Sequence, residues 1–174
     1  MKKEGKKKAG HSATKGGATE EPPRYGAVQH GSAAGEALGL LKQGYNCCQA
    51  VLVAYAERHG LERNMALKLG SGFGSGVSQL GEMCGAVTGA VLVLGLKHGC
   101  GCAEDEAAKR KTEELVRKFV GRFKQRHGSM VCRQLLGCDP NKPEEFEWAV
   151  RQGLFATRCP KLVRHAVEIL EELA

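Results

Sequence analysis

The chain has 174 residues, the length of one ordinary domain with enough sequence to bury a core. Its N-terminus is basic, but no apolar segment follows, so we expect neither a secretory signal peptide nor a membrane span. Eight cysteines in a chain without such a signal are more typical of metal ligands or redox thiols in the cytoplasm than of structural disulfides.

The first part of the chain is polar, glycine-rich and basic. Residues 1–34 carry seven Lys or Arg residues against three acids, whereas the remainder is only mildly basic. Because residues 1–31 show no periodic apolar positions, we predict a disordered basic tail there. Its lysines could dock nucleic acid or an acidic partner, but a solvated leader explains them better, so we expect no nucleic-acid binding.

Helical spacing of apolar residues begins near Ser32 and recurs through the rest of the chain. Ser32 is predicted to cap a short helix that Gly44 ends, and Asn46 is predicted to cap the next helix. Cys47 would be the first residue of this second helix. Apolar residues follow both Cys47 and Cys48 at helical spacing, so the sequence leaves open which of the two thiols points inward.

A short helix at most is expected over residues 64–69, before the glycine-rich segment G-S-G-F-G-S-G at residues 70–76. Such a segment could cradle a phosphate. However, it does not complete the spacing of a dinucleotide-binding loop, it lacks the Gly-Lys-Ser/Thr of a P-loop, and no strand precedes it. We therefore expect its glycines to allow close backbone approach and positive φ angles beside the following helix.

The most apolar stretch, residues 79–96, is predicted to form a glycine-rich central helix around which the others pack. Cys84 stands at its head, and we expect its thiol to point inward from the first turn. Gly85 and Gly89 are four residues apart and would let neighbouring backbones approach closely. We expect this helix to be buried on all sides.

A long amphipathic helix is predicted from about residue 104 to residue 126, after a turn that contains Cys100-Gly-Cys102. Its basic outer face is interleaved with acids and lacks an aromatic platform, so we expect it to face solvent. Small and apolar residues at helical spacing form its inner face: Ala108, Thr112, Leu115, Val116, Phe119 and Phe123.

Two shorter helices are predicted next. Ser129 would cap the first of them, which places Cys132 at its third position. Pro143 would begin the second. Three residues of this second helix are expected to face inward: Phe146, Ala149 and Val150.

The last helix is predicted to start at Pro160, with Cys159 as its cap residue, because proline is favoured at the first helical position. No convincing strand appears anywhere in the sequence. We therefore predict an all-α fold, a single-domain helical bundle over residues 32–174.

Four cysteines share one predicted position: Cys47, Cys84, Cys132 and Cys159 each lie in the first turn of a different helix and head an apolar face. We predict that they converge in one core. A helix N-terminus carries about half a positive charge and lowers the pKa of a thiol placed there. Four inward thiolates are a ligand set for an iron–sulfur cluster or zinc. Buried cysteines can also be mere small hydrophobic residues, but four at one helical position favour a functional site.

The same residues carry a family resemblance. The segments N-C-x-Q-A-V from Asn46, C-G-A-V-T-G-A from Cys84 and C-R-x-L-L-G from Cys132, followed by Cys159, resemble the redox-active family named for its C_GCAxxG_C_C pattern. The resemblance covers about residues 35–174. Related modules occur in split-Soret cytochrome c, where this type of domain is associated with an iron–sulfur centre and accompanies haem groups.

This resemblance implies a helical, redox-active domain with the four cysteines as its active set. The chain contains no C-x-x-C-H, so we expect no covalent haem of the c type. The remaining thiols are additional to the family pattern. Cys100 and Cys102, with His98 nearby, could form a second metal or exchange site or simply a mobile glycine-rich turn.

Three functions are open at this point. The first is an electron-transfer protein with an iron–sulfur cluster and an unidentified redox partner protein. The second is a cytosolic thiol–disulfide oxidoreductase that uses pairs of the same thiols. The third is a structural zinc protein, which is disfavoured because the four cysteines are far apart in sequence and structural zinc sites usually draw on close pairs. No acid–base pair stands out, and a homo-oligomer stays open.

Overall fold

A computed structural model of the protein describes residues 32–173, so the predicted tail at residues 1–31 lies outside the described residues. Within the described part, the chain forms eight α-helices and two short 3₁₀ helices, with no β-strand. A single antiparallel bridge joins Met83 to Val131. The all-α prediction is confirmed.

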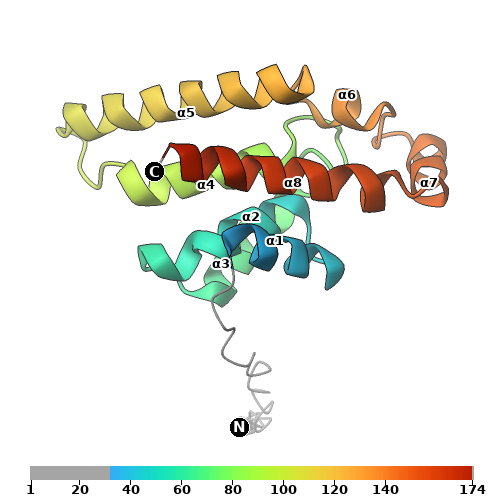
Figure 1. Ribbon diagram of the computed structural model, residues 1–174, viewed down its shortest axis with the longest axis horizontal. Helices are drawn as coiled ribbons and strands as arrows, with labels where there is room; N and C mark the ends of the chain where they lie inside the picture. The colour runs from blue at the N-terminus through green and yellow to red at the C-terminus, as the bar shows by residue number, and fades with distance from the viewer. Residues whose placement is uncertain (1–31, 174) are drawn as a thin grey trace, which may run out of the picture.

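The helices form three layers (Figure 1). One outer layer contains α5, the other contains α1, α2 and α3, and α4 and α8 lie between them. None of the described helices has the length and apolar character needed to cross a membrane. Their bounds are α1 Ala33–Lys42, α2 Cys47–Ala56, α3 Arg63–Gly70, α4 Gly85–His98, α5 Glu106–His127, α6 Cys132–Leu136, α7 Pro143–Arg151 and α8 Leu154–Glu172, with 3₁₀ turns at Glu57–His59 and Ser71–Phe73.

The glycine-rich helix α4 contacts α2, α5 and α8. Its glycines allow this packing, because a β-carbon added at Gly89 would lie 2.9 Å from the carbonyl oxygen of Cys48 and 2.9 Å from the Cβ of Val51. The predicted close approach is confirmed. The expectation that α4 is buried on all sides is wrong for its last turns, where Leu96 is exposed because no described element covers that side.

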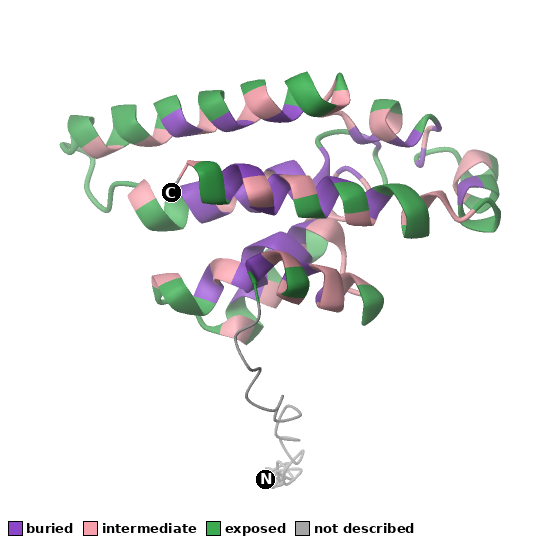
Figure 2. Ribbon diagram, in the orientation of Figure 1, coloured by how far each residue is buried: buried purple, intermediate pink, exposed green. Residues whose placement is uncertain are grey.

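Most buried residues of α2, α4, α5 and α8 belong to one apolar core, and Figure 2 shows the buried side of α5 turned toward the middle layer. On α5, Leu115, Phe119 and Phe123 are buried as predicted. Two arginines of its outer side form ion pairs with α8, Arg122 with Glu172 and Arg126 with both Glu168 and Glu172.

Two predictions for the shorter helices are wrong. Helix α6 begins at Cys132 itself, with Val131 as its cap, because the Ser129 hydroxyl instead accepts a hydrogen bond from the Val131 N–H (3.0 Å) and closes a turn before the helix. Helix α7 begins at Pro143 as predicted and buries Ala149. Val150, however, lies on the outer side of α7 and is 54% exposed.

Helix α8 begins at Leu154, so the prediction that Pro160 starts the last helix is wrong. The added turn follows Gly153, whose φ is 65°, and its Phe155 ring packs on Phe146 of α7 with centroids 5.3 Å apart. These contacts extend the helix upstream of the proline. Because Pro160 has no N–H, it cannot donate the usual hydrogen bond to the carbonyl of Ala156.

Candidate four-cysteine redox site

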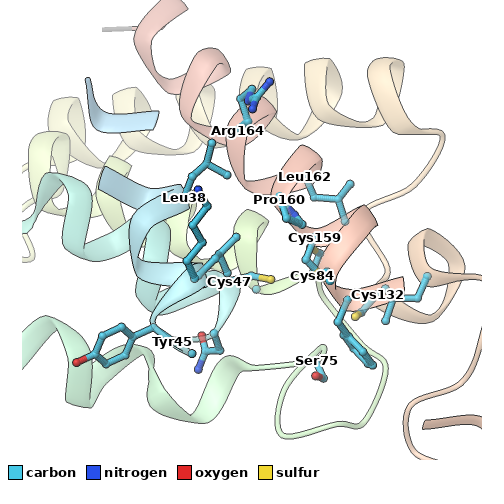
Figure 3. Close-up of a pocket in the computed structure, with 18 residues that line it drawn as sticks. Leu38, Tyr45, Cys47, Ser75, Cys84, Cys132, Cys159, Pro160, Leu162 and Arg164 are labelled. Atoms are coloured by element: carbon cyan, nitrogen blue, oxygen red, sulfur yellow. The ribbon is translucent and has the colours of Figure 1, made fainter. Parts of the chain in front are cut away.

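One pocket of about 550 Å³ is lined by all four cysteines that the sequence singled out (Figure 3). Cys47 is the first residue of α2, Cys84 immediately precedes α4, Cys132 is the first residue of α6, and Cys159 lies within α8. Cys47 is half-buried and the other three are buried. The fold therefore brings four distant segments to one pocket, and the remaining four cysteines do not line it.

The first turn of α2 is fixed by a capping box around Cys47. The Asn46 side-chain oxygen accepts hydrogen bonds from the N–H groups of Cys48 (2.9 Å) and Gln49 (3.0 Å), and the Gln49 side chain accepts one from the Asn46 N–H (3.0 Å). The Asn46 amide also donates to the carbonyls of Gly70 and Ser71, both at 3.1 Å. Asn46 therefore caps α2 and attaches its first turn to the end of α3.

Backbone hydrogen bonds hold Cys84 and Cys132 next to each other. The Cys84 N–H donates to the carbonyl of Met130 (2.9 Å), and the Cys132 N–H donates to the carbonyl of Glu82 (2.6 Å). These bonds flank the bridge between Met83 and Val131. The relative position of the two cysteines is therefore set by the main chain, independently of any side-chain cap.

The loop before α4 adopts an unusual backbone conformation beside the pocket. Four non-glycine residues in succession around Gly76 have positive φ, including Val77 at 63°, a conformation that is costly for a β-branched residue. Gly76 lies against Cys132, since a β-carbon added there would be 2.6 Å from the Cys132 Cβ. The predicted role of the glycines in close approach and positive φ is confirmed, but the left-handed run over Ser75 and residues 77–79 was not foreseen.

A hydrogen bond between two thiols controls their ionisation. The Cys47 thiol donates a hydrogen bond to the sulfur of Cys159, and this bond raises the pKa of Cys47 well above its usual value and lowers the pKa of Cys159. Burial adds to the rise at Cys47 and opposes the fall at Cys159. Cys159 is therefore the pocket thiol whose pKa is lowered.

The pKa values of the other two pocket thiols are raised. Burial raises the pKa of Cys84 to about 11, although the backbone N–H groups of Ala86 and Val87 oppose part of the shift. Burial also raises the pKa of Cys132, and the neighbouring thiols add to it. The expectation of lowered pKa values at helix starts is therefore wrong for Cys47, Cys84 and Cys132. The hydrogen bond to Cys159 outweighs the helix dipole at Cys47, and burial outweighs it at Cys84 and Cys132. Cys159, the exception, lies inside a helix.

The four cysteines outside the pocket occupy three environments. Cys48 is buried in the core beside Cys84, and burial raises its pKa to about 12. Cys138 belongs to the same small apolar cluster as Cys132 and Cys159. Cys100 and Cys102 are exposed after the end of α4. The structure thus resolves the choice between the first two thiols: Cys47 lines the pocket and Cys48 belongs to the core.

The donor set of the pocket is four thiols, whose thiolate forms suit iron and zinc. Within residues 32–173, no group of three or more His, Cys, Asp or Glu side chains is arranged to hold a metal ion as it stands. The assignment of Cys47, Cys84, Cys132 and Cys159 as metal ligands stays a prediction.

Comparison with known protein families identifies one match, and it covers the four cysteines of this pocket. The family is described as "Putative redox-active protein (C_GCAxxG_C_C)" and matches residues 45–173. Comparison with curated proteins and with solved structures finds no match. The family match spans most of the chain and includes all four pocket cysteines, so the protein belongs to the redox-active C_GCAxxG_C_C family.

Proposed function

We propose that this protein is a cytoplasmic electron-transfer protein whose four pocket cysteines hold an iron–sulfur cluster. The observation that carries the proposal is the single pocket lined by Cys47, Cys84, Cys132 and Cys159 from four separate segments. Thiol–disulfide exchange requires only two thiols, whereas an iron–sulfur cluster is held by four thiolates. When bound, such a cluster would accept and release single electrons.

The ionisation of the thiols suits such a ligand. The hydrogen bond to Cys159 raises the pKa of Cys47, and burial raises the pKa of Cys84 and Cys132, so these three thiols favour the protonated form. Four buried thiolates without compensation would be very costly. Bound iron would reverse this balance, because its positive charge would stabilise the thiolates. Cys47, Cys84, Cys132 and Cys159 would be its ligands.

Electrons would be exchanged with a partner protein that is still to be identified. Cys47 is the one residue of the four that is half-buried rather than buried, and it is the first residue of α2. We infer that the partner approaches the pocket beside the start of α2.

The test is the iron and acid-labile sulfide content of anaerobically purified protein, together with its absorbance spectrum. We expect Cys84→Ser to lose both iron and sulfide, and each of the other three pocket cysteines to behave likewise. Cys48→Ala is the matched control, because Cys48 is buried beside Cys84 but does not line the pocket. Full iron retention in Cys84→Ser, or equal loss in Cys48→Ala, would sink the assignment.

A second candidate is thiol–disulfide exchange, which the hydrogen bond between Cys47 and Cys159 favours. The Cys159 thiolate would attack the disulfide of a partner and release one partner thiolate. The Cys47 thiol would then lose its proton and attack the mixed disulfide, which releases the second partner thiolate. The products are a Cys47–Cys159 disulfide and a reduced partner. Metal-free anaerobic protein that readily forms this disulfide, mapped by peptide mass spectrometry, would establish this candidate instead.

A further inference from the structure

The rim of the four-cysteine pocket carries two positive charges. Lys42, in the last turn of α1, and Arg164, in α8, both line the pocket and are exposed, whereas no acidic residue lines it. Within residues 32–173, neither cation forms an ion pair. By contrast, Arg122 and Arg126 on the far side of the bundle are paired with acids of α8. The pocket therefore opens to solvent between two cations without internal counter-charges.

The walls below this rim are mainly apolar. Helix α1 contributes Leu38 and Leu41, which share a helix face with Lys42, and α8 contributes Leu162. Ala156 and Pro160 stand on the same stripe of α8 as Arg164, at intervals of four residues. Figure 3 shows all three of Leu38, Pro160 and Leu162 above the labelled cysteines, with Leu38 to the left and Arg164 above them. A ligand entering between α1 and α8 would thus pass the charges first, then apolar side chains, then sulfur.

We propose that this pocket binds a small organic anion, with its acidic group between Lys42 and Arg164 and its apolar body against Leu38, Leu41 and Leu162. Such a ligand supplies the missing counter-charge at the rim and fills the apolar space of a pocket of about 550 Å³, a size within the range of small-molecule sites. The claim that this ligand would lie beside a redox centre rests on the proposed function. The claim that it binds in the pocket does not.

The test compares two probes of the same shape and opposite charge, 2-naphthoate and 2-naphthylmethylamine, by fluorescence titration of the full chain at pH 7. We expect 2-naphthoate to bind at least about tenfold more tightly than the amine, since an anion gains charged hydrogen bonds at the rim that the amine cannot make. Lys42→Gln and Arg164→Gln should each weaken 2-naphthoate binding about fivefold. The double variant Lys42→Glu/Arg164→Glu should reverse the preference in favour of the amine.

The matched control is Lys161→Glu, because Lys161 is exposed on α8 near Arg164 but does not line the pocket. The net charge of the chain is +7, so general attraction of anions to a basic protein has to be distinguished from binding at the rim. Lys161→Glu lowers this net charge as well, but it should leave the preference for 2-naphthoate unchanged. Equal binding of the two probes, or an equal loss of 2-naphthoate affinity in Lys161→Glu and Arg164→Gln, would overturn the proposal. Circular dichroism verifies that each variant folds.

The binding test and the iron analysis separate the two proposals. Protein that binds 2-naphthoate through Lys42 and Arg164 but contains no iron refutes the cluster and keeps the anion site. Iron-loaded protein without a preference for 2-naphthoate refutes the anion site and keeps the cluster.

Discussion

The two ends of α4 place cysteines in opposite environments. At its start, Cys84 is 2% exposed and shares a pocket with thiols from three other segments. Just beyond its end, Cys100 and Cys102 are exposed in a short turn between α4 and α5. The two ends also differ in their glycines: a β-carbon at Gly85 would meet neighbouring atoms at 2.9 Å, whereas one at Gly95 would meet nothing within 4 Å.

This difference shows what distinguishes a built thiol site from a pair of cysteines close in sequence. The pocket thiols come from separate parts of the chain, and capping, backbone hydrogen bonds and close helix packing fix them in place. Cys100 and Cys102 are separated by a single glycine, and both are exposed. Proximity in sequence is thus a poor guide to which cysteines share the pocket of this protein, and packing around α2 and α4 is a better one.

The largest effect is expected where α4 meets α2. We predict that Gly89→Leu lowers the free energy of unfolding by more than about 2 kcal/mol, because its side chain would overlap the Cys48 carbonyl and the Val51 side chain. Urea denaturation measures the change. The control at the other end of α4 is Gly95→Ala, because a β-carbon added at Gly95 would meet no atom within 4 Å. This variant should instead stabilise the protein by about 0.5–1 kcal/mol. Equal destabilisation by both variants would contradict the proposed difference between the ends.

The next effect is expected at the cap of α2. Asn46→Ala removes the acceptor of two backbone N–H groups and the donor to Gly70 and Ser71, so the free energy of unfolding should fall by about 2 kcal/mol. Any iron content should fall as well, because Cys47 is the residue that this cap positions. Ser32→Ala is the control, since Ser32 caps α1 through a single hydrogen bond away from the pocket. It should cost about 1 kcal/mol and leave iron unchanged.

The sequence predicts most of this fold because its signals are local. Caps and apolar periodicity place the starts of α1 and α2 correctly and the inner face of α5 closely. The start of α8 is missed because Pro160 reads as a first helical residue, while the added turn depends on the contact between Phe155 and Phe146 of another helix. Contacts of that kind are not visible in the sequence.

The sequence predicts the four cysteines of the pocket, but the argument that each of them lies at a helix start is wrong for one of them. All four cysteines line one pocket, but Cys159 lies inside α8 and not at a helix start. The directions of the pKa shifts depend on burial and on which thiols meet, and both follow from tertiary packing. The positive φ of Val77 opposes the local preference of its residue type, so sequence patterns could not indicate it.

A smaller effect is expected from pH on the reduced, metal-free protein. Cys84 and Cys48 have pKa values raised to about 11 and about 12 in the folded state, from a usual value of 9.0. The unfolded chain therefore releases these protons first as pH rises. The contribution of these two thiols to stability should be constant below pH 9 and should fall above it, by up to about 1.4 kcal/mol per pH unit for each thiol.

Urea denaturation between pH 8 and 11 measures this slope. The raised pKa values of Cys47 and Cys132 contribute to the slope in the same direction. Cys48→Ala removes one contributing thiol and should make the slope shallower, whereas Cys100→Ser at the exposed end should leave it unchanged. A slope that is the same in all three proteins would mean that the buried thiols do not contribute to it.

The smallest effect is expected at the hydrogen bond between Cys47 and Cys159, a single interaction of about 1 kcal/mol. Because the Cys47 thiol lowers the pKa of Cys159, Cys47→Ala should raise that pKa and shift the pH profile of Cys159 alkylation to higher pH. Iodoacetamide and peptide mass spectrometry measure this in metal-free protein that carries Cys100→Ser and Cys102→Ser, so that the exposed turn consumes no reagent. In the parent of this series, Cys159 should react at lower pH than Cys84 or Cys132.

Cys132→Ala is the control, since Cys132 does not determine the pKa of Cys159. If Cys132→Ala shifted the profile as much as Cys47→Ala, the shift would reflect general repulsion among the pocket thiols and not the hydrogen bond.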